Sequence, residues 1–224
     1  MGSGEYLPWS TEAERFALGP AAEDGPVALL ATASAPEGDR VFDAWETMGL
    51  SHFESLGIRA RRIELKTRED ASRADLIDNI QDARLIFFSG GNPAYLKDTL
   101  DGTPFLNAMT QAMAAGAIFA GCSAGAMVAG ARTARPVGPA YRYAGLGLIP
   151  GVRFGVHWNR MPAFLPKESI VSAGDPSDSF IGIDESTAIV GDGTSWRVFG
   201  LGTAEVRRLG RHTRYGAGEE FSLE

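Results

Sequence analysis

The first 125 residues alternate between short uncharged runs and segments that carry a helical stripe of apolar side chains. The runs at 27–32, 85–88 and 117–120 each have the length of one strand. Such runs are typical of strands that are buried on both faces of a parallel sheet. Residues 39–56 and 74–83 carry apolar side chains about one helical turn apart, which predicts amphipathic helices. The same reasoning predicts one more strand at 59–65 and helices at 11–18, 94–100 and 104–115.

After residue 145 the helical stripes give way to short segments that are separated by Gly, Asp and Ser. This spacing is typical of strands joined by tight turns. We expect these strands to complete the sheet begun in the first half and to add an antiparallel hairpin layer. The whole pattern predicts an α/β fold: a doubly wound, mostly parallel sheet flanked by helices, with a β-rich C-terminal part. The expected C-terminal strands are 152–157, 181–184, 187–190, 196–199, 204–208 and 220–223.

Two stretches fall outside this pattern. Residues 132–143 contain Pro136 and Pro139 and are predicted to form an exposed loop. Residues 1–5 read Met-Gly-Ser-Gly-Glu, which fits either an added tag or a native glycine turn. The chain has no internal repeat and no low-complexity tract, so we expect a single domain over 1–224.

Composition and charge argue against several classes of protein. A net charge of −7, a pI near 5.1 and the lack of a basic run argue against nucleic-acid binding. Cys122 is the only cysteine, which excludes an internal disulfide and a Cys-rich zinc site, so we expect no metal and no cofactor. No apolar segment approaches the roughly 20 residues of a membrane helix, and the N-terminus lacks a signal-peptide layout. We therefore expect a cytoplasmic protein that does not engage a membrane.

The segment Gly121-Cys122-Ser123-Ala124-Gly125 follows the apolar run 117–120 directly. Glycines two places either side of a serine permit a strand-to-helix turn tight enough to expose the central side chain. The Ser123 hydroxyl would then be accessible, and the Ala124 amide, at the start of a helix, could stabilise a developing oxyanion. A glycine-rich turn with an incidental serine fits the same residues, so the rest of the chain must decide between the two interpretations.

A serine nucleophile needs a general base, and the chain contains three histidines. His52 lies within the predicted helix 39–56, and His212 lies among arginines on a late polar hairpin. Both positions favour a structural or surface role. His157 instead ends an apolar strand and opens the loop Trp158-Asn159-Arg160. Catalytic residues of α/β sheets gather just past strand ends, so His157 is the preferred base.

The third member of a serine triad is a carboxylate that orients the imidazole. No Asp or Glu lies between Ser123 and His157, so the acid must come from elsewhere in the chain. Asp184 and Glu185 lie at the end of the predicted strand 181–184. We prefer Glu185, because strand alternation leaves the residue past the strand end to turn outward. Two acids in a turn-rich loop stay open as alternatives: Asp175 and Asp178.

A second glycine-rich turn, Gly90-Gly91-Asn92, follows the apolar run 85–88. A glycine pair after a buried strand lets backbone N–H groups approach an anionic centre closely. We assign the Gly91 amide as a second oxyanion donor beside that of Ala124. A simple strand-to-helix turn is the alternative interpretation.

The order of these motifs resembles the serine peptidases of the dipeptidase E and cyanophycinase family. The likeness runs from about Val27 to Val190 and includes Ser-Gly-Gly-Asn, Gly-Cys-Ser-Ala-Gly-Ala, Gly-Leu-Gly-Leu-Ile-Pro-Gly before a histidine, and Gly-Ile-Asp-Glu. These enzymes look like class I glutamine amidotransferases, of flavodoxin-like fold, whose nucleophilic cysteine has become serine. The resemblance implies these roles: Ser123 as nucleophile, His157 as base, Glu185 as acid, and Gly91 and Ala124 as oxyanion donors. We expect Gly90 and Asn92 to contact the substrate.

The resemblance also implies a small aspartyl peptide as substrate, either with an N-terminal Asp or with a β-linked Asp-Arg pair, and it implies a homodimer. A substrate carboxylate favours a guanidinium partner, since bidentate pairing is strong and directional. Arg160, three residues after His157, is the first candidate for this contact, and Arg153 is the second.

Two departures from the family pattern leave the substrate open. Dipeptidase E enzymes carry an aspartate between serine and histidine, which is lacking here, and cyanophycinases have Asp-Gln where this chain has Asn92-Pro93. Two other functions therefore stay open. One is a non-catalytic small-molecule binding or sensor module on the same fold. The other is an amidotransferase that uses Cys122, a weaker interpretation because the residue before the tip of the turn should point into the core.

Overall fold

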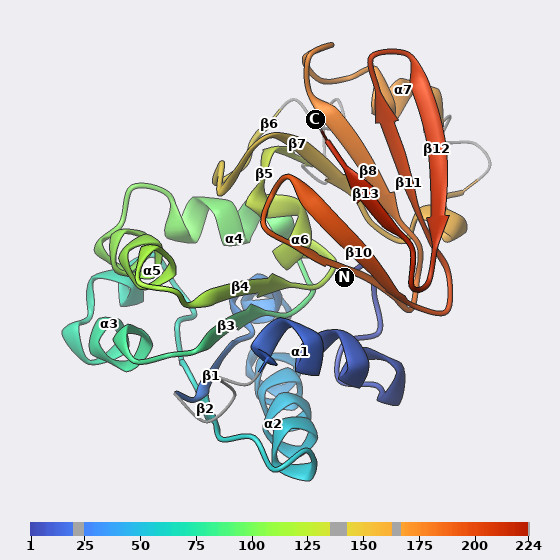
Figure 1. The fold of residues 1–224 in the computed structure, drawn as a ribbon. Helices are drawn as coiled ribbons and strands as arrows, with labels where there is room; N and C mark the ends of the chain where they lie inside the picture. The colour runs from blue at the N-terminus through green and yellow to red at the C-terminus, as the bar shows by residue number, and fades with distance from the viewer. Residues whose placement is uncertain (20–24, 135–142, 163–166, 224) are drawn as a thin grey trace. The chain divides into compact units, whose positions relative to one another are not determined.

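The chain divides into two units, which Figure 1 shows coloured along the sequence. Leu18–Gly125 forms the first, here called the parallel-sheet unit, and Met1–Ala17 with Ala126–Glu224 forms the second, here called the β-rich unit. A single domain over 1–224 stays a prediction. The computed structural model describes residues 1–19, 25–134, 143–162 and 167–223.

The sheet of the parallel-sheet unit has four strands, all parallel. Their spatial order is β2 (Ala60–Arg62), β1 (Val27–Leu30), β3 (Leu85–Phe88) and β4 (Ile118–Gly121). Every residue of β1 and β3 is buried. The uncharged runs of the sequence therefore form the central strands of a covered parallel sheet, as predicted.

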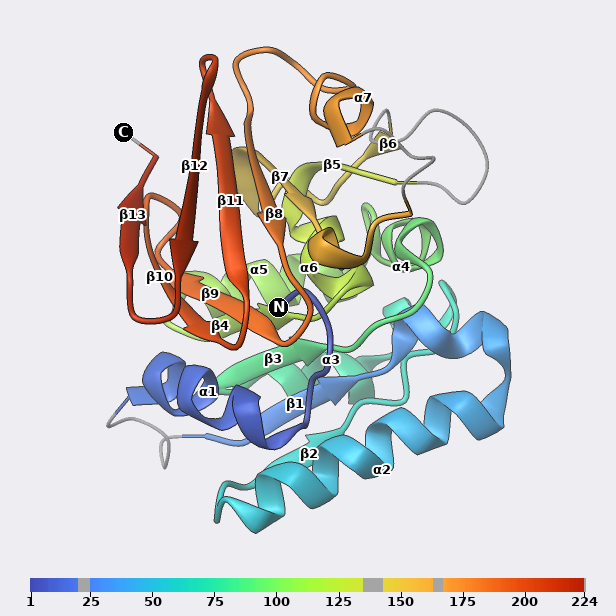
Figure 2. The same ribbon diagram turned by 90° about the vertical axis from the view of Figure 1, so that its right-hand side faces the viewer.

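Helices follow the strands of this unit and flank its sheet (Figure 2). Where the longest of them ends, Gly57 has a φ of +73°, its amide donates to the Glu54 carbonyl, and the Ile58 amide donates to the Phe53 carbonyl. This Schellman pattern requires a residue that tolerates positive φ, which explains the glycine. The helices are α2 (Asp39–Ser55), α3 (Ala74–Gln81), α4 (Pro93–Leu100) and α5 (Pro104–Ala114), with 3₁₀ turns η3 (Thr32–Glu37) and η4 (Asp70–Ser72).

The strands of the β-rich unit form two sheets among the described residues. The three-stranded sheet is antiparallel, in the order β13 (Glu220–Ser222), β10 (Ser195–Gly200), β9 (Thr187–Gly191). The order of the six-stranded sheet is β12 (Arg211–Gly216), β11 (Thr203–Arg208), β8 (Ser179–Ile183), β7 (Ile149–Gly155), β5 (Gly130–Thr133) and β6 (Tyr143–Ala144). In this sheet β8, β7 and β5 run parallel to one another, and Figure 2 shows β12, β11 and β8 side by side.

Few helices accompany these strands in the described part of the chain. The N-terminal pair is η1 (Pro8–Ser10) and α1 (Thr11–Leu18), and η5 (Trp158–Arg160) and α7 (Lys167–Val171) lie between β7 and β8 in sequence. The remaining helix, α6 (Ala124–Ala129), spans the boundary between the two units. None of the described helices combines the length and apolar composition needed to cross a bilayer.

Three sequence predictions need correction. The C-terminal strands do not complete the first sheet, because in the described residues they pair only with strands of the β-rich unit. The strand predicted at 59–65 ends at Arg62, where the chain turns and the Leu65 amide donates to the Ile63 carbonyl at 2.7 Å. The ends of the predicted loop 132–143 are strand residues of β5 and β6, and Pro136 and Pro139 lie outside the described residues.

The first residues of the chain are packed into the β-rich unit. The Gly2 amide donates to the Thr187 carbonyl at 2.9 Å. A Cβ atom on Gly2 would lie 2.0 Å from the Asp184 carbonyl oxygen, so only glycine fits there. Gly4 has a φ of +72°, which also favours glycine. This close packing favours the native glycine turn over the added tag.

Candidate active site

Ser123 stands at a sharp turn between β4 and α6, as the glycine spacing predicts. Its φ is +49°, a left-handed conformation that costs a non-glycine residue roughly 1 kcal/mol or more. A Cβ atom on Gly125 would lie 2.4 Å from the Phe88 carbonyl oxygen, so glycine is required for α6 to begin this close to the end of β3. The strained serine and the obligatory glycine are the features of a nucleophile elbow.

Two backbone amides beside this turn have no hydrogen-bond acceptor among the described residues: those of Gly91 and Ala124. The parallel pairing of Phe88 with Gly121 places the ends of β3 and β4 next to each other, and each amide comes three residues later. Ala124 is fully buried, and a buried N–H without an acceptor costs about 1–3 kcal/mol. An incoming oxyanion that accepts from these groups would remove that cost.

The glycine loop after β3 is fixed by close packing against η3. Gly91 has a φ of +141°, and a Cβ atom there would lie 2.3 Å from the Ala33 carbonyl oxygen. The Asn92 amide donates to that same carbonyl at 2.7 Å, and the Asn92 Oδ1 accepts from the Tyr95 amide at 3.1 Å as the N-cap of α4. Asn92 therefore has a structural role in addition to its predicted contact with substrate. Gly90, the other predicted contact, is buried.

His157 lies two residues past the end of β7 and has a left-handed backbone, with φ +50° and ψ +36°. Its Nδ1 is 3.1 Å from Oε1 of Glu185. A carboxylate at Nδ1 stabilises the tautomer that carries its proton there, which leaves the Nε2 lone pair to act as a base. The hydrogen bond with His157, together with the charges of His157 and Arg160, lowers the pKa of Glu185.

Two further groups hold Glu185 in place. The Glu185 amide donates to Oδ1 of Asn159 at 2.9 Å, and Arg160 Nε donates to Glu185 Oε2 at 3.3 Å. Two side chains of the loop that follows His157 thus contact Glu185: Asn159 contacts its backbone amide, and Arg160 contacts its carboxylate. Sequence reasoning missed the role of Asn159, whose only signal was its position two residues after the histidine.

The other candidate acids have different partners. Asp184 Oδ2 accepts from both the amide and the hydroxyl of Thr203, at 3.0 and 2.8 Å. Asp178 lies 3.5 Å from Nε of Arg153, and Asp175 accepts from Ser177. Of the acids considered from sequence, Glu185 is the one that contacts His157.

The two candidate arginines differ in exposure. The Arg153 side chain is 3% exposed, and its Nη2 donates to the Val171 carbonyl at 2.8 Å. That guanidinium is committed to holding α7 and the residues after it on the sheet. The Arg160 side chain is 75% exposed, and beyond its Nε its guanidinium makes no hydrogen bond to any described residue. Arg160 is therefore the better placed of the two to meet a substrate carboxylate.

The remaining titratable candidates are Cys122, His52 and His212. Cys122 is fully buried, as predicted for the residue before the tip of the turn. His52 packs edge-on against Phe53, and His212 Nε2 lies 3.2 Å from Oε1 of the buried Glu205. In the described parts of the chain, no three His, Cys, Asp or Glu side chains cluster in a way that could hold a metal ion.

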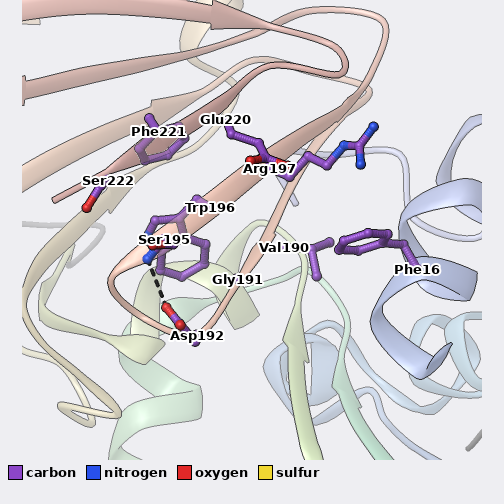
Figure 3. A pocket seen from close by; sticks show the side chains of 10 residues that line it. All are labelled: Phe16, Val190, Gly191, Asp192, Ser195, Trp196, Arg197, Glu220, Phe221 and Ser222. Carbon is purple, nitrogen blue, oxygen red and sulfur yellow. Dashed lines mark hydrogen bonds between the residues drawn. The ribbon is translucent and has the colours of Figure 1, made fainter.

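A surface pocket of about 490 Å³ lies in the β-rich unit, between α1 and the three-stranded sheet (Figure 3). Asp192 in this pocket accepts from the amides of Thr194 and Ser195, so it closes the β9–β10 turn. None of the predicted site residues lines the pocket. The lining residues are Phe16, Val190, Gly191, Asp192, Ser195, Trp196, Arg197, Glu220, Phe221 and Ser222.

The predicted site residues thus fall into two groups. Ser123, Gly91 and Ala124 lie at the ends of neighbouring strands in the parallel-sheet unit. His157 and Glu185 lie in the β-rich unit, in contact with each other and with Arg160. The first group supplies a hydroxyl and two amide donors, and the second supplies an oriented imidazole and a guanidinium.

The chain resembles known peptidases along most of its length. Residues 27–199 match the model of Peptidase family S51. A cyanophycinase from Synechococcus elongatus is 31% identical over 183 residues, which is 76% of this chain but only 56% of that protein, so the chain spans little more than half of that relative.

Solved structures agree with this match. The crystal structure of a peptidase from an acI-B1 Actinobacterium has a TM-score of 0.87 and 32% identity, and the match covers 100% of this chain and 95% of the other. A candidate peptidase E protein from Listeria monocytogenes EGD-e has a TM-score of 0.61 at 16% identity, covering 97% and 96% of the two chains, and supports the fold alone. The chain belongs to peptidase family S51.

Proposed function

We propose that this chain is a serine-type peptidase that hydrolyses short aspartyl peptides, with Ser123 as its nucleophile. The observation that carries most weight is a pair of amides that have no acceptor among the described residues. One is that of Gly91, in the loop after β3, and the other is that of Ala124, directly after the strained Ser123. Donors of this kind stabilise the charge that develops on a carbonyl oxygen when a nucleophile attacks. An incidental glycine turn would not need two such groups beside a half-buried serine.

The proposed reaction has two halves. In the first, Ser123 Oγ attacks the peptide carbonyl carbon, His157 Nε2 takes the hydroxyl proton, and the amides of Gly91 and Ala124 hold the oxyanion. The C–N bond then breaks, and the imidazolium gives its proton to the leaving amine. In the second half, water attacks the acyl-enzyme with His157 again as base, which releases the acid and restores the serine.

Glu185 supports both proton transfers in this scheme. Its carboxylate keeps the His157 proton on Nδ1 and stabilises the imidazolium that forms. The lowered pKa of Glu185 keeps this carboxyl ionised well into the acid range, so it can serve in this way at neutral pH. The lack of an acid between Ser123 and His157 is therefore no obstacle, because the acid comes from the turn after β8.

Arg160 is proposed to bind the substrate carboxylate. Its Nε is committed to Glu185, while the rest of its exposed guanidinium can pair with an aspartyl side chain. Hydrogen bonds to charged groups are worth about 1.5–3 kcal/mol. Replacing Arg160 with Gln should therefore raise KM for aspartyl peptides about 10-fold or more. KM for a matched alanyl peptide should change much less.

The main test combines a covalent probe with a peptide panel. A fluorophosphonate should modify Ser123, as mapped by mass spectrometry, and the protein should cleave Asp-X or β-aspartyl dipeptides in preference to Ala-X dipeptides. Ser123→Ala should abolish both modification and cleavage, whereas Ser177→Ala, at an exposed serine whose side chain bonds only Asp175 within the described residues, should change neither.

Three outcomes would point elsewhere. Full activity in Ser123→Ala would rule out Ser123 as the nucleophile. Tight binding of peptides with no turnover in the natural chain would favour the sensor function. Rapid inactivation by thiol-alkylating reagents would favour an amidotransferase, although Cys122 is buried. The homodimer that the family resemblance implies can be tested separately by light scattering.

A further inference from the structure

The backbone of His157 needs support from its neighbours, because a left-handed histidine is strained. Its φ of +50° costs roughly 1 kcal/mol or more relative to an ordinary conformation. One support is the turn of η5, where the Arg160 amide donates to the His157 carbonyl at 2.8 Å. The other is the next side chain, Trp158, which is 1% exposed.

Trp158 lies on a floor made of two paired glycines. Gly155 of β7 pairs with Gly182 of β8 in the parallel ladder. A Cβ atom on Gly182 would lie 2.6 Å from Cγ and Cδ1 of Trp158, and one on Gly155 would lie 3.1 Å from its Cε3. Any larger residue at Gly182 would occupy the space of the indole. The two glycines thus form a flat recess for this one side chain.

Other groups close the recess around the indole. Lys167 Nζ lies 4.6 Å from the ring centre, and because the sheet occupies one face of the indole, the ammonium lies on the other. The Phe180 ring centre is 4.9 Å away, at an interplanar angle of 55°. These contacts pack the indole against the glycine floor and leave it 1% exposed.

The pyrrole edge of the indole faces β11. Cε3 lies over β7 and Cδ1 over β8, so the Nε1 edge points toward Glu205, which pairs with Gly182 across the next ladder. Nε1 makes no hydrogen bond of ordinary geometry within the described residues, but Trp158 is one of the groups that lower the pKa of Glu205, so the indole N–H lies close to that carboxylate. Glu205 is itself fixed by Arg207 Nε at 2.7 Å and Arg214 Nη2 at 3.0 Å.

We propose that Trp158 is a positioning residue that holds His157 in its left-handed conformation and so keeps Nδ1 against Glu185. This inference rests on the proposed function of His157 as the base. The glycine floor, Lys167 and the ion-paired Glu205 fix the indole, and the indole fixes the backbone that begins one residue earlier. A small shift of the indole would therefore be passed to the imidazole.

The most direct test moves the indole without changing it. Gly182→Ala places a methyl group where the ring now lies, and we expect the rate constant for fluorophosphonate modification of Ser123 to fall at least 10-fold. Substrate KM should change less than twofold. Gly216→Ala is the matched control. Gly216 is the last residue of β12, the edge strand of the same sheet, and among the described residues its added Cβ would meet only Glu219 Oε2, at 3.5 Å. Its rate constant should stay within twofold of the natural chain.

A second pair of variants keeps the test open if Gly182→Ala does not fold. Trp158→Ala should lose at least 10-fold in the same rate constant, and Trp158→Phe, which leaves a flat ring on the glycine floor, should recover to within about threefold. In NMR spectra of ¹⁵N-histidine-labelled protein, the Nδ1 proton signal of His157 should be lost in Gly182→Ala and Trp158→Ala but kept in Gly216→Ala.

The readouts separate this inference from the proposed function. Folded Gly182→Ala or Trp158→Ala with a natural rate constant and an unchanged His157 signal would overturn the positioning role. If the natural chain itself is not modified at Ser123, the proposed function fails, while the NMR signal still tests whether Trp158 positions His157. A lower melting temperature with an unchanged rate constant per folded molecule would mean that Trp158 is only structural.

Discussion

The two units contribute different kinds of chemical group to the proposed reaction. In the parallel-sheet unit these groups are one hydroxyl and two backbone amides, held by glycines that cannot be enlarged. In the β-rich unit they are an imidazole, a carboxylate and a guanidinium that contact one another. Replacing a glycine with a larger residue should therefore displace the amides of the parallel-sheet unit. In the β-rich unit, substitutions that change charge or hydrogen bonding should have the larger effect.

The same difference extends to the buried glutamates of the two units. Glu46 of α2 is buried and lies 3.3 Å from Arg62 Nε, and its burial outweighs the charges of Arg62 and Lys66 and raises its pKa to about 7. Glu205 of β11 is also buried, yet hydrogen bonds from Arg207 and Arg214 outweigh burial and lower its pKa to about 2. The surroundings of Glu205 in the β-rich unit thus stabilise a buried charge, and those of Glu46 in the parallel-sheet unit do not.

The largest expected effect comes from the acid of the β-rich unit. Glu185→Gln should lower kcat about 10³-fold with little change in KM, because the amide no longer stabilises the imidazolium and can favour the wrong histidine tautomer. Steady-state kinetics on an Asp-X dipeptide would measure this loss.

Asp175→Asn is the matched control for this substitution. Asp175 is an exposed acid of the same unit whose carboxylate hydrogen-bonds only Ser177 among the described residues, so kcat of the variant should stay within twofold. A kcat for Glu185→Gln that matches this control would remove Glu185 from the mechanism.

The next effect comes from adding one methyl group to the parallel-sheet unit. Gly91→Ala would drive a Cβ atom into the Ala33 carbonyl and displace the Gly91 amide. Loss of one oxyanion donor typically costs about 10²–10³ in kcat. Gly102→Ala separates this clash from backbone strain, because Gly102 also has a positive φ, +68°, but has open space around its Cβ position.

Gly102→Ala should lose roughly 1 kcal/mol of stability through strain alone, Gly91→Ala should lose more because of the added clash, and only Gly91→Ala should lose kcat per folded molecule. Equal kcat values in the two variants would show that the Gly91 amide donates nothing to the transition state. Thermal unfolding of both proteins, measured alongside kcat, would complete the comparison.

The same difference between the units decides what the sequence could predict. Local signals were enough for the parallel-sheet unit: the run at 85–88 forms β3, and the glycine spacing around Ser123 forms a strained turn. The β-rich unit depends on remote contacts. His212 was placed on a late hairpin, but no strand range was predicted for β12, because its exposed polar residues 211–214 lack the alternation of a half-buried strand.

The triad acid shows the same limit. Sequence alone could rank Glu185 over Asp184 only by the expected direction of a strand end. The structure adds a contact of 3.1 Å between Glu185 and His157, which are 28 residues apart in the chain, and the role of Glu185 as the acid stays a proposal. The two glycines under Trp158 gave no sequence signal, because pairing between β7 and β8 is what brings them together.

Replacing the two buried glutamates should have opposite effects on stability. A raised pKa in the folded state means that stability falls as pH rises from about 4.5 toward 7, so Glu46→Gln should stabilise the protein by about 2 kcal/mol at pH 8. A lowered pKa means that stability is lost as pH falls from about 4.5 toward 2. Glu205→Gln should therefore destabilise the protein by about 2 kcal/mol at pH 7.

Urea unfolding at pH 5 and pH 8 would measure both effects. The stabilisation by Glu46→Gln should shrink at pH 5, where the natural carboxyl is protonated in the folded state. The same sign for both substitutions at pH 8 would contradict the contrast between the units.

The smallest expected effect separates the two roles of Asn92. Asn92→Ala removes the N-cap of α4 and should cost about 1 kcal/mol of stability. Thr103→Ala removes the equivalent cap of α5 and is the matched control, because Thr103 has no proposed contact with substrate.

Asn92→Asp should keep the cap, since aspartate is as good a cap as asparagine, but its charge should repel an aspartyl substrate. If Asn92 contacts substrate, KM for Asp-X peptides should rise in both Asn92 variants and stay unchanged in Thr103→Ala. If KM is unchanged in all three, Asn92 serves only to begin α4, and the specificity for aspartyl peptides rests on Arg160 in the β-rich unit.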